Sequence, residues 1–166
     1  MDIGRLITLL ALGLPLAALA ARPPTPQAVQ GVVSKVDEGD SLWLSTPGQA
    51  PVAVHLRNID APEICQTWGE ESRRALAELA LNKPATLRAT GRDGAGRLVG
   101  TVLVDGTDVA KRMVEEGHAW SVRTRWDRGP LVKQELMAKA LNRGLHGAGG
   151  AVMPSEFRKS HGPCAN

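Results

Sequence analysis

Three short polar clusters contain the side chains of this 166-residue chain that are best suited to catalysis. They lie at residues 37–41, 60–63 and 93–97. Asp and Gly gather in turns whatever a protein does, so each cluster alone indicates no more than a turn. All three nevertheless adjoin strand-like segments, and the ends of strands are where a rigid scaffold displays functional side chains. The clusters are therefore considered together.

Together they contain the parts of a phosphodiesterase. Asp40 and Asp60 offer hard oxygen ligands, which suit Ca²⁺ or Mg²⁺. Glu63, three residues after Asp60, could position and deprotonate a water molecule beside the cation. Arg97 offers a forked, permanently charged donor to phosphate oxygens. A cation, a carboxylate base and an arginine could drive the attack of water on a phosphodiester and stabilise the negative charge that develops.

Five segments of the chain form a recognisable pattern: VDEGDSL at 36–42, LRNIDAPE at 56–63, DGAGR at 93–97, VEEGHAW at 114–120 and GLH at 144–146. On these segments the chain resembles the staphylococcal nuclease family from residue 31 to residue 147. The segment IDAPE at 59–63 is the most specific of them. The resemblance implies a β-barrel plus α fold, namely an OB-type five-stranded barrel with about three helices. It also implies Ca²⁺-dependent hydrolysis of DNA and RNA that leaves 3′-phosphate ends.

The same resemblance assigns roles to individual residues. Asp40 and Asp60 correspond to the calcium-binding carboxylates, and Ala61 to the position whose backbone carbonyl binds the metal. Glu63 corresponds to the general base. Arg97 corresponds to the arginine that contacts the phosphate and the leaving oxygen.

His55 is a departure from the family pattern, because a second arginine usually stands five residues before the second metal aspartate. Three explanations stay open. An imidazolium could supply the charge without the fork of an arginine, or Arg57, two positions on and hence on the same strand face, could reach over. The third is a weakened or inactive site. Losing one such donor typically costs about 10²–10³ in rate, so we expect a slow enzyme rather than an inert one.

A basic segment near residue 125 is a second candidate for substrate binding. Arg123 and Arg125 stand where a well-known family member has tyrosines that hold the nucleotide. With Arg128, Lys133 and Trp126 they have the composition of a groove that follows phosphates, although a solvated basic loop has the same composition. The net charge of +3 does not decide between the two. With four Trp, one Phe and no Tyr, the chain is a poor match for a general single-strand binder that stacks bases on aromatic side chains.

The elements that must position these residues follow from the hydrophobic pattern. Strands are predicted over 31–36, 41–45, 52–56, 85–92 and 98–104. Helices are predicted over 69–81, 108–116 and 131–143. This order favours a small antiparallel barrel with helices packed against it over a doubly wound parallel sheet. The tail over 148–166 is predicted to be a loop.

Residues 1–20 have the composition of a signal peptide. Arg5 supplies a positive charge, an apolar stretch follows it, and small residues precede an expected cleavage near Ala20–Ala21. We therefore expect an exported protein, periplasmic or secreted, with no membrane span in the mature chain. A Pro-rich lead-in over 21–30 would precede one domain over 31–147, expected to be a monomer.

Cys65 and Cys164 are the two cysteines of the chain. In an oxidising compartment they could pair, which would hold the tail two residues from Glu63, whereas two free buried thiols are the alternative. If they pair, Arg158 and the basic residues after it would lie near the rim of the site and could contact phosphates of the substrate. The other interpretation is a disulfide that only restrains the tail and has no role in substrate binding.

The combined prediction is an exported, Ca²⁺-dependent endonuclease that acts on DNA and RNA. The alternative is a catalytically impaired OB module that binds nucleic acid. His55 favours this alternative, whereas the presence of Asp40, Asp60, Glu63 and Arg97 disfavours it. A carbohydrate- or protein-binding barrel would explain neither the carboxylates nor Arg97.

Overall fold

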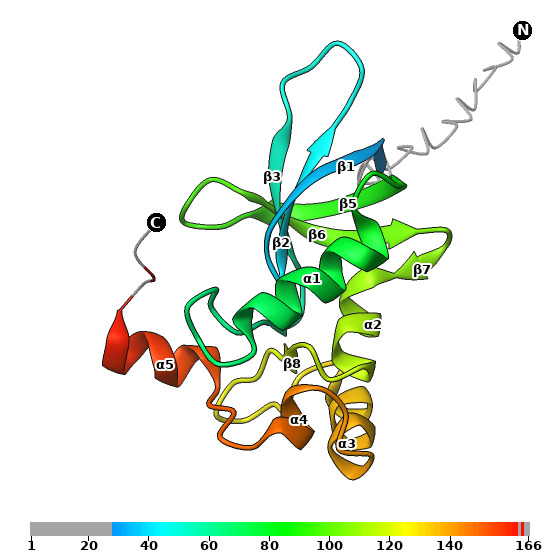
Figure 1. The fold of residues 1–166 in the computed structure, drawn as a ribbon. Helices are drawn as coiled ribbons and strands as arrows, with labels where there is room; N and C mark the ends of the chain where they lie inside the picture. Colours follow the sequence, from blue (N-terminus) through cyan, green and yellow to red (C-terminus); the bar gives the residue numbers. More distant parts are fainter. Residues whose placement is uncertain (1–27, 163, 165–166) are drawn as a thin grey trace, which may run out of the picture.

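The computed structural model describes residues 28–162 and 164, and Figure 1 shows a β-barrel with helices packed below it. Its five strands are β1 (Ala28–Glu38), β2 (Ser41–Ser45), β3 (Val52–Leu56), β5 (Pro84–Arg92) and β6 (Leu98–Val104). They are hydrogen-bonded in the order β3-β2-β1-β5-β6, and β3 also pairs with β6 and so closes the ring. The predicted fold class, an OB-type barrel plus helices, is confirmed.

The pairing that closes the barrel differs from the all-antiparallel arrangement that we expected. β3 and β6 run parallel, with Val54 opposite Leu98 and Leu56 opposite Gly100. The reason is the odd number of strands. Four successive antiparallel pairs around the ring leave its first and last strands pointing the same way. The closing pair must then be parallel.

The long strand β1 shapes the barrel because it pairs with two neighbours in succession. Its first half lies against β5 and its second half against β2, and the β1–β2 register shifts after Val33 and again after Val36. Such irregularities bend a strand and increase its twist. The alternating apolar side chains of the five strands fill the interior, where Val33, Leu44 and Leu87 are fully buried.

Helices α1 (Gly69–Ala80) and α2 (Val109–Glu115) pack against the barrel, and α3 (Val132–Ala140) packs against α2 on the side away from the barrel, as Figure 1 shows. α1 buries Leu76 and Ala80 in the core, and α2 buries Met113 and Val114. These are the three predicted helices. α3 ends at Ala140, three residues before its predicted end, and Asn142 beyond it adopts a left-handed conformation with φ of 50°.

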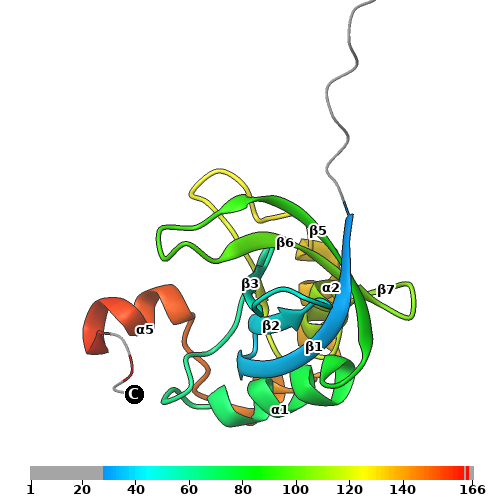
Figure 2. The ribbon, with the colours of Figure 1, turned by 90° about the horizontal axis from the view of Figure 1, so that it is seen from above.

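The predicted loop over 148–166 is wrong, because the structure has a helix α5 (Pro154–His161) there, preceded by a short helix α4 (Leu145–Ala148). Proline at the first helical position and basic residues in the last turn are helix signals. α5 lacks the continuous apolar stripe by which the other helices are found, and Pro154 is its one buried residue. Figure 2 shows α5 standing to one side of the barrel.

The remaining elements are short strands. β4 (Ile59–Asp60) pairs with β8 (Trp120–Ser121), and β7 (Thr107–Asp108) extends the sheet beyond β6. The Pro-rich lead-in was predicted to reach residue 30, but residues 28–30 are already part of β1. The predicted signal peptide and residues 21–27 lie outside the described residues. Within the described part of the chain, no helix has the length and apolarity needed to cross a bilayer.

Candidate active site

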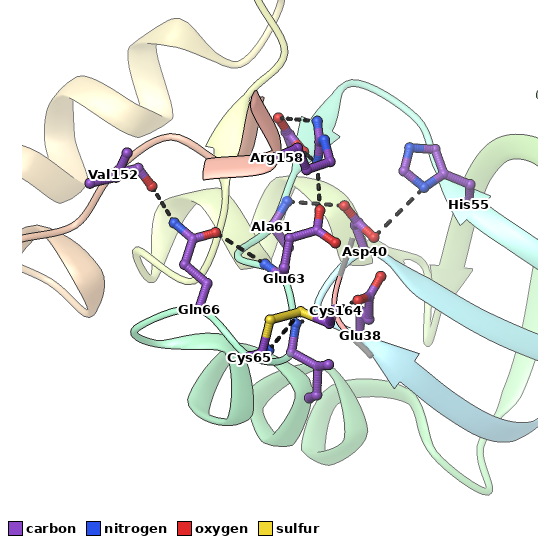
Figure 3. A network of polar contacts seen from close by, with 12 residues as sticks. Glu38, Asp40, His55, Ala61, Glu63, Cys65, Gln66, Val152, Arg158 and Cys164 are labelled. Atoms are coloured by element: carbon purple, nitrogen blue, oxygen red, sulfur yellow. Dashed lines mark hydrogen bonds and ion pairs between the residues drawn. A yellow bond between two sulfur atoms is a disulfide. The ribbon is translucent and has the colours of Figure 1, made fainter. Parts of the chain in front are cut away.

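Asp40, Asp60, Glu63 and Arg97, which come from three separate turns, line one open pocket of about 460 Å³. The folding of the barrel thus brings together the four side chains to which the sequence assigns chemistry. The whole lining consists of Asp40, His55, Ile59, Asp60, Glu63, Asp93, Arg97, Val122 and Arg158. Figure 3 shows how several of these side chains converge.

Asp40 is part of the pocket lining and lies in the two-residue turn between β1 and β2. One carboxylate oxygen accepts a hydrogen bond from the Ala61 N–H at 3.0 Å, and the residue is only 6% exposed. Burial raises the pKa of Asp40 to about 7; the Ala61 hydrogen bond opposes this shift, and the charge of Asp60 adds to it. A negative charge on Asp40 is therefore costly unless a cation lies beside it.

The turn that carries Asp40 is packed tightly against α1. A Cβ atom placed on Gly39 would lie 1.7 Å from the Ser72 hydroxyl oxygen and 2.9 Å from the Ala61 Cβ. Only glycine fits at this distance, so the turn cannot move away from the segment that carries Ala61 without leaving a gap. This contact fixes the position of Asp40 relative to Ala61.

Glu63 lies in the loop between β4 and α1, and this loop is held at two points. The Glu63 N–H donates to the side-chain oxygen of Gln66 at 3.2 Å, and the Gln66 amide nitrogen donates to the Val152 carbonyl at 2.6 Å. A Cβ on Gly69, the first residue of α1, would lie 2.1 Å from the Glu63 carbonyl oxygen. The sequence analysis did not single out Gln66, because one glutamine in a loop carries no sequence signal.

Arg97 is oriented by Asp93 within the turn between β5 and β6. Its Nε donates to one oxygen of Asp93 at 2.7 Å, and its backbone N–H donates to the other at 3.0 Å. Among the described residues, only the Nε of this guanidinium has a protein partner. Its two terminal nitrogens are thus available for an anion in the pocket.

His55, on β3, lies in the pocket as a half-buried neutral ring. Its Nδ1 is 3.7 Å from the nearer oxygen of Asp40, and within the described chain that buried nitrogen has no hydrogen-bond partner. Burial lowers the pKa of His55, and the charge of Arg97 lowers it further. Because the ring is then neutral at neutral pH, it is a poor replacement for an arginine.

Arg57 does not share the strand face of His55. β3 ends at Leu56, and Arg57 is exposed in the turn that follows, with its backbone N–H bonded to the Gly100 carbonyl at 2.9 Å. Arg57 is outside the lining of the pocket. The interpretation of Arg57 as a substitute arginine is therefore not supported by its position.

A second cation of the pocket lining is Arg158, from α5. Its guanidinium donates to the two oxygens of Asp60 at 3.2 and 3.3 Å and to Glu63 at 2.5 Å. The predicted disulfide between Cys65 and Cys164 is present and ties the end of this segment to the Glu63 loop (Figure 3). Arg158 was expected at the rim of the site, and the structure places it inside.

The two arginines of the basic segment have different surroundings. Arg123 forms an ion pair with Glu135, which is 2% exposed, so its guanidinium is held by the protein. Arg125 lies over the ring of Trp126, 4.8 Å from its centre. Both line a second cavity of about 480 Å³, which adjoins the first through the shared residues Asp60 and Val122. Arg125 is the one better placed to contact a long substrate.

The residues present fit a hard divalent cation. The buried Asp40 carboxylate, with its raised pKa and with Asp60 and Glu63 nearby, needs a positive charge beside it, and carboxylate oxygens are the donors that Ca²⁺ prefers. In residues 28–162 and 164, no three His, Cys, Asp or Glu side chains are grouped as a complete set of metal ligands. The side chains whose oxygens could bind the cation are Asp40 and Asp60.

Comparison with known proteins adds independent information. A model of the family described as "Staphylococcal nuclease homologue" matches residues 53–146. A "Probable staphylococcal-like nuclease CAN3" of Oryza sativa subsp. japonica is 31% identical over 137 residues, which cover 80% of this chain and 36% of the relative. The chain therefore spans little more than a third of the length of this plant relative.

Two bacterial relatives match over most of their length. An "Uncharacterized endonuclease" of Haemophilus influenzae is 30% identical over 128 residues, which cover 76% of this chain and 71% of the relative. The "Protein ParB" of Escherichia coli is 31% identical over 156 residues, which cover 87% of each chain.

Proposed function

The chain belongs to the staphylococcal nuclease family, and from this membership and the pocket described above we propose that it hydrolyses phosphodiester bonds of DNA and RNA in a metal-dependent reaction. The observation that carries the proposal is the convergence of Asp40, Asp60, Glu63 and Arg97 on one open pocket. Hard metal ligands, a carboxylate base and an arginine are the groups that this reaction needs.

Glu63 is the residue proposed to activate the attacking water. Among the described carboxylates that line the pocket, Asp40 and Asp60 are the proposed metal ligands and Asp93 pairs with Arg97. Glu63, whose ion-pair partner is Arg158, is the one that remains. It takes a proton from the water as the water oxygen bonds to phosphorus. The bond between phosphorus and the 5′ oxygen breaks, that oxygen takes up a proton, and the phosphate stays on the 3′ side.

Arg97 is proposed to hold the phosphate during this step. Asp93 fixes its Nε, so the terminal nitrogens are already oriented before the substrate binds, and no reorganisation is needed as negative charge develops. Asp40, Asp60 and the backbone carbonyl of Ala61 would hold Ca²⁺, which when bound supplies a Lewis acid for the phosphate oxygens. Other divalent ions could use the same oxygen ligands.

The substrate and the compartment are part of the proposal. Arg125 in the adjoining cavity supports binding of a polynucleotide longer than the scissile dinucleotide. The disulfide supports export to an oxidising compartment, periplasmic or extracellular, because such bonds rarely persist in the cytosol. We propose that the protein acts there as a monomer.

The test is digestion of single-stranded DNA and RNA by the purified protein, in Ca²⁺ and in EGTA, beside a Glu63→Gln variant. We expect cleavage that requires the cation, leaves 3′-phosphate ends and falls by about 10²-fold or more in the variant, because general-base catalysis contributes about 10²–10⁴. Glu70→Gln is the matched control, since Glu70 is an exposed glutamate that also pairs with an arginine.

The outcomes separate the proposal from its alternative. Cation-independent cleavage, or equal rates for Glu63→Gln and the control, would contradict the mechanism. Salt-sensitive binding of the oligonucleotide without any cleavage would favour the impaired OB module, for which the neutral ring of His55 is the supporting observation.

A further inference from the structure

We propose that Arg158 of α5 is a catalytic residue, a second arginine that lines the same pocket as Arg97 and binds the phosphate of the substrate beside Asp60 and Glu63. This inference rests on the proposed nuclease function. It goes beyond that function because Arg158 lies outside the matched family segment, which ends at residue 146. It concerns a residue carried on a C-terminal helix that the barrel does not need in order to close.

The position of Arg158 is the first observation. Its guanidinium lies between Asp60 and Glu63, with Nη1 at 3.2 Å from one and 2.5 Å from the other, and Nη2 at 3.3 Å from the second oxygen of Asp60. A phosphate that is attacked by the water molecule activated by Glu63 must also come close to the Arg158 guanidinium. Arg158 is therefore within reach of the phosphate without any movement of the backbone.

The charge balance of the pocket is the second observation. Asp40, Asp60 and Glu63 face a space that a phosphodiester, itself an anion, must enter. Arg97 is paired with Asp93, whereas the positive charge beside Asp60 and Glu63 comes from the guanidinium of Arg158. Its side chain is 43% exposed, which leaves part of the guanidinium accessible from the open side of the pocket.

The attachment of α5 is the third observation, because it shows that Arg158 is held in place rather than resting on the surface. Cys164 is bonded to Cys65, two residues after Glu63, with 5.7 Å between the two Cα atoms. On the other side of α5, the Val152 carbonyl accepts from the Gln66 amide at 2.6 Å. The loop that carries Glu63 thus holds both ends of α5, as Figure 3 shows.

These contacts give Arg158 its role in the reaction. A cation bound by Asp40 and Asp60 would take over the oxygens of Asp60. The edge of the Arg158 guanidinium formed by Nη2 and Nε could then turn to the phosphate, while Nη1 stays on Glu63. Its flat fork can bind two phosphate oxygens at once. The negative charge that grows on these oxygens during attack strengthens the contact in the transition state, so the residue acts on kcat more than on KM.

The experiment compares wild type with Arg158→Ala, Arg158→Lys and Arg73→Ala. Arg73 is the matched control, because it also pairs with a glutamate and is 40% exposed, but lies on α1 outside the pocket. Two properties are measured in Ca²⁺. The first is kcat and KM on single-stranded DNA. The second is the affinity, by calorimetry, for a dinucleotide in which CH₂ replaces the bridging 5′ oxygen, which keeps the charge but cannot be cleaved.

We expect Arg158→Ala to lower kcat by about 10²–10³ and to weaken binding of the analogue by about tenfold, as for the loss of one charged donor. Arg158→Lys should recover part of both, because it keeps the charge but not the fork. Arg73→Ala should match wild type. Melting temperatures of the variants show whether the fold is intact, which the exposure of Arg158 leads us to expect.

Three results would overturn the inference. Faster cleavage or tighter Ca²⁺ binding by Arg158→Ala would show that Arg158 competes with the cation for the metal ligands and so inhibits the enzyme. Unchanged kinetics and analogue affinity would make its ion pairs structural. Full activity of Arg158→Lys together with loss in Arg73→Ala would indicate a general charge effect. If wild type fails to cleave, the proposed function fails, but the analogue affinity still decides whether Arg158 binds the phosphate.

Discussion

At the scale of single residues, Asp40 shows how a functional site can weaken the protein that carries it. Its carboxylate is buried, and it accepts a single backbone hydrogen bond from Ala61. Burial raises the pKa of Asp40 to about 7 from its usual value of 3.8, so the folded protein holds this proton longer than the unfolded chain does. The free energy of unfolding therefore falls as the pH rises from the unfolded-state pKa of 3.8 through the folded-state pKa of about 7.

The corresponding prediction is that Asp40→Asn stabilises the protein in EGTA at about pH 8, by up to about 4 kcal/mol at ~1.4 kcal/mol per pKa unit. At about pH 3 the wild type and the variant should be equally stable, because Asp40 is then protonated in the folded and in the unfolded state. Urea unfolding at the two pH values measures the difference. In excess Ca²⁺ the advantage of the variant should shrink, since the cation stabilises wild type by binding its folded state. A less stable variant in EGTA would contradict the argument.

The residue types of the site could be predicted from the sequence, but not all of their environments. Asp40, Asp60, Glu63 and Arg97 follow from turn clusters and from the family resemblance, and they meet in one pocket. A positive charge on His55 was one of three explanations left open. It depends on the pKa of the ring, and that pKa depends on burial and on the position of Arg97, which no local pattern encodes.

At the scale of elements, the site depends on a chain of contacts that begins in α3. Glu135 of α3 is 2% exposed and accepts hydrogen bonds from the Ser121 N–H and from the side chains of Arg123 and Lys139. Ser121 belongs to β8, and β8 pairs with β4, where Asp60 lies opposite Trp120. One buried carboxylate therefore supports the strand that presents a proposed metal ligand.

We expect Glu135→Gln to lower the free energy of unfolding by about 2–3 kcal/mol at neutral pH, because it leaves two cations without their buried partner. Burial raises the pKa of Glu135, but hydrogen bonds from Arg123 and Lys139 outweigh it and lower that pKa. The stabilisation is thus present above the unfolded value of 4.5 and is lost as the pH falls through the folded one. Chemical unfolding as a function of pH tests this dependence.

The control for Glu135→Gln is Glu70→Gln, which breaks an exposed pair with Arg73. Exposed pairs contribute about 0–1 kcal/mol, so this variant should be close to wild type at every pH. Equal effects of the two variants would mean that burial of Glu135 does not matter.

The elements that the sequence did not predict have a common physical cause. The barrel strands, α1 and α2 bury an apolar face, and this leaves a periodic pattern in the sequence. α5 buries little besides Pro154 and is held by a disulfide, one amide hydrogen bond and the ion pairs of Arg158. Such contacts join residues distant in sequence, and a hydrophobic pattern does not record them.

At the scale of the whole molecule, one covalent bond joins the loop that carries Glu63 to a segment 99 residues later. In the chain-entropy account, closing a loop of this length stabilises the folded state by about 4 kcal/mol. The bond also limits how far α5 can move from the pocket, so stability and the position of Arg158 are linked through it.

We therefore expect the double variant Cys65→Ser, Cys164→Ser to lose up to about 4 kcal/mol of unfolding free energy. Its kcat should fall towards that of Arg158→Ala, because α5 is no longer held at its end. Adding Arg158→Ala to the double variant should then have little further effect, since both changes remove the same contact. Urea unfolding and kcat of the three proteins measure this. Additive losses would show that the disulfide and Arg158 act independently.

The distance along the chain between the two ends of this bond also sets an order of assembly during synthesis. The barrel and α1 to α4 are complete by residue 148, whereas Arg158 and Cys164 leave the ribosome only afterwards. The pocket can thus form before its second arginine exists, and the bond that holds it forms only under oxidising conditions. A newly made chain in a reducing cell interior would lack this attachment. Under the proposed export and nuclease function, this arrangement would delay full activity until the protein has left the compartment that holds the genome of the cell.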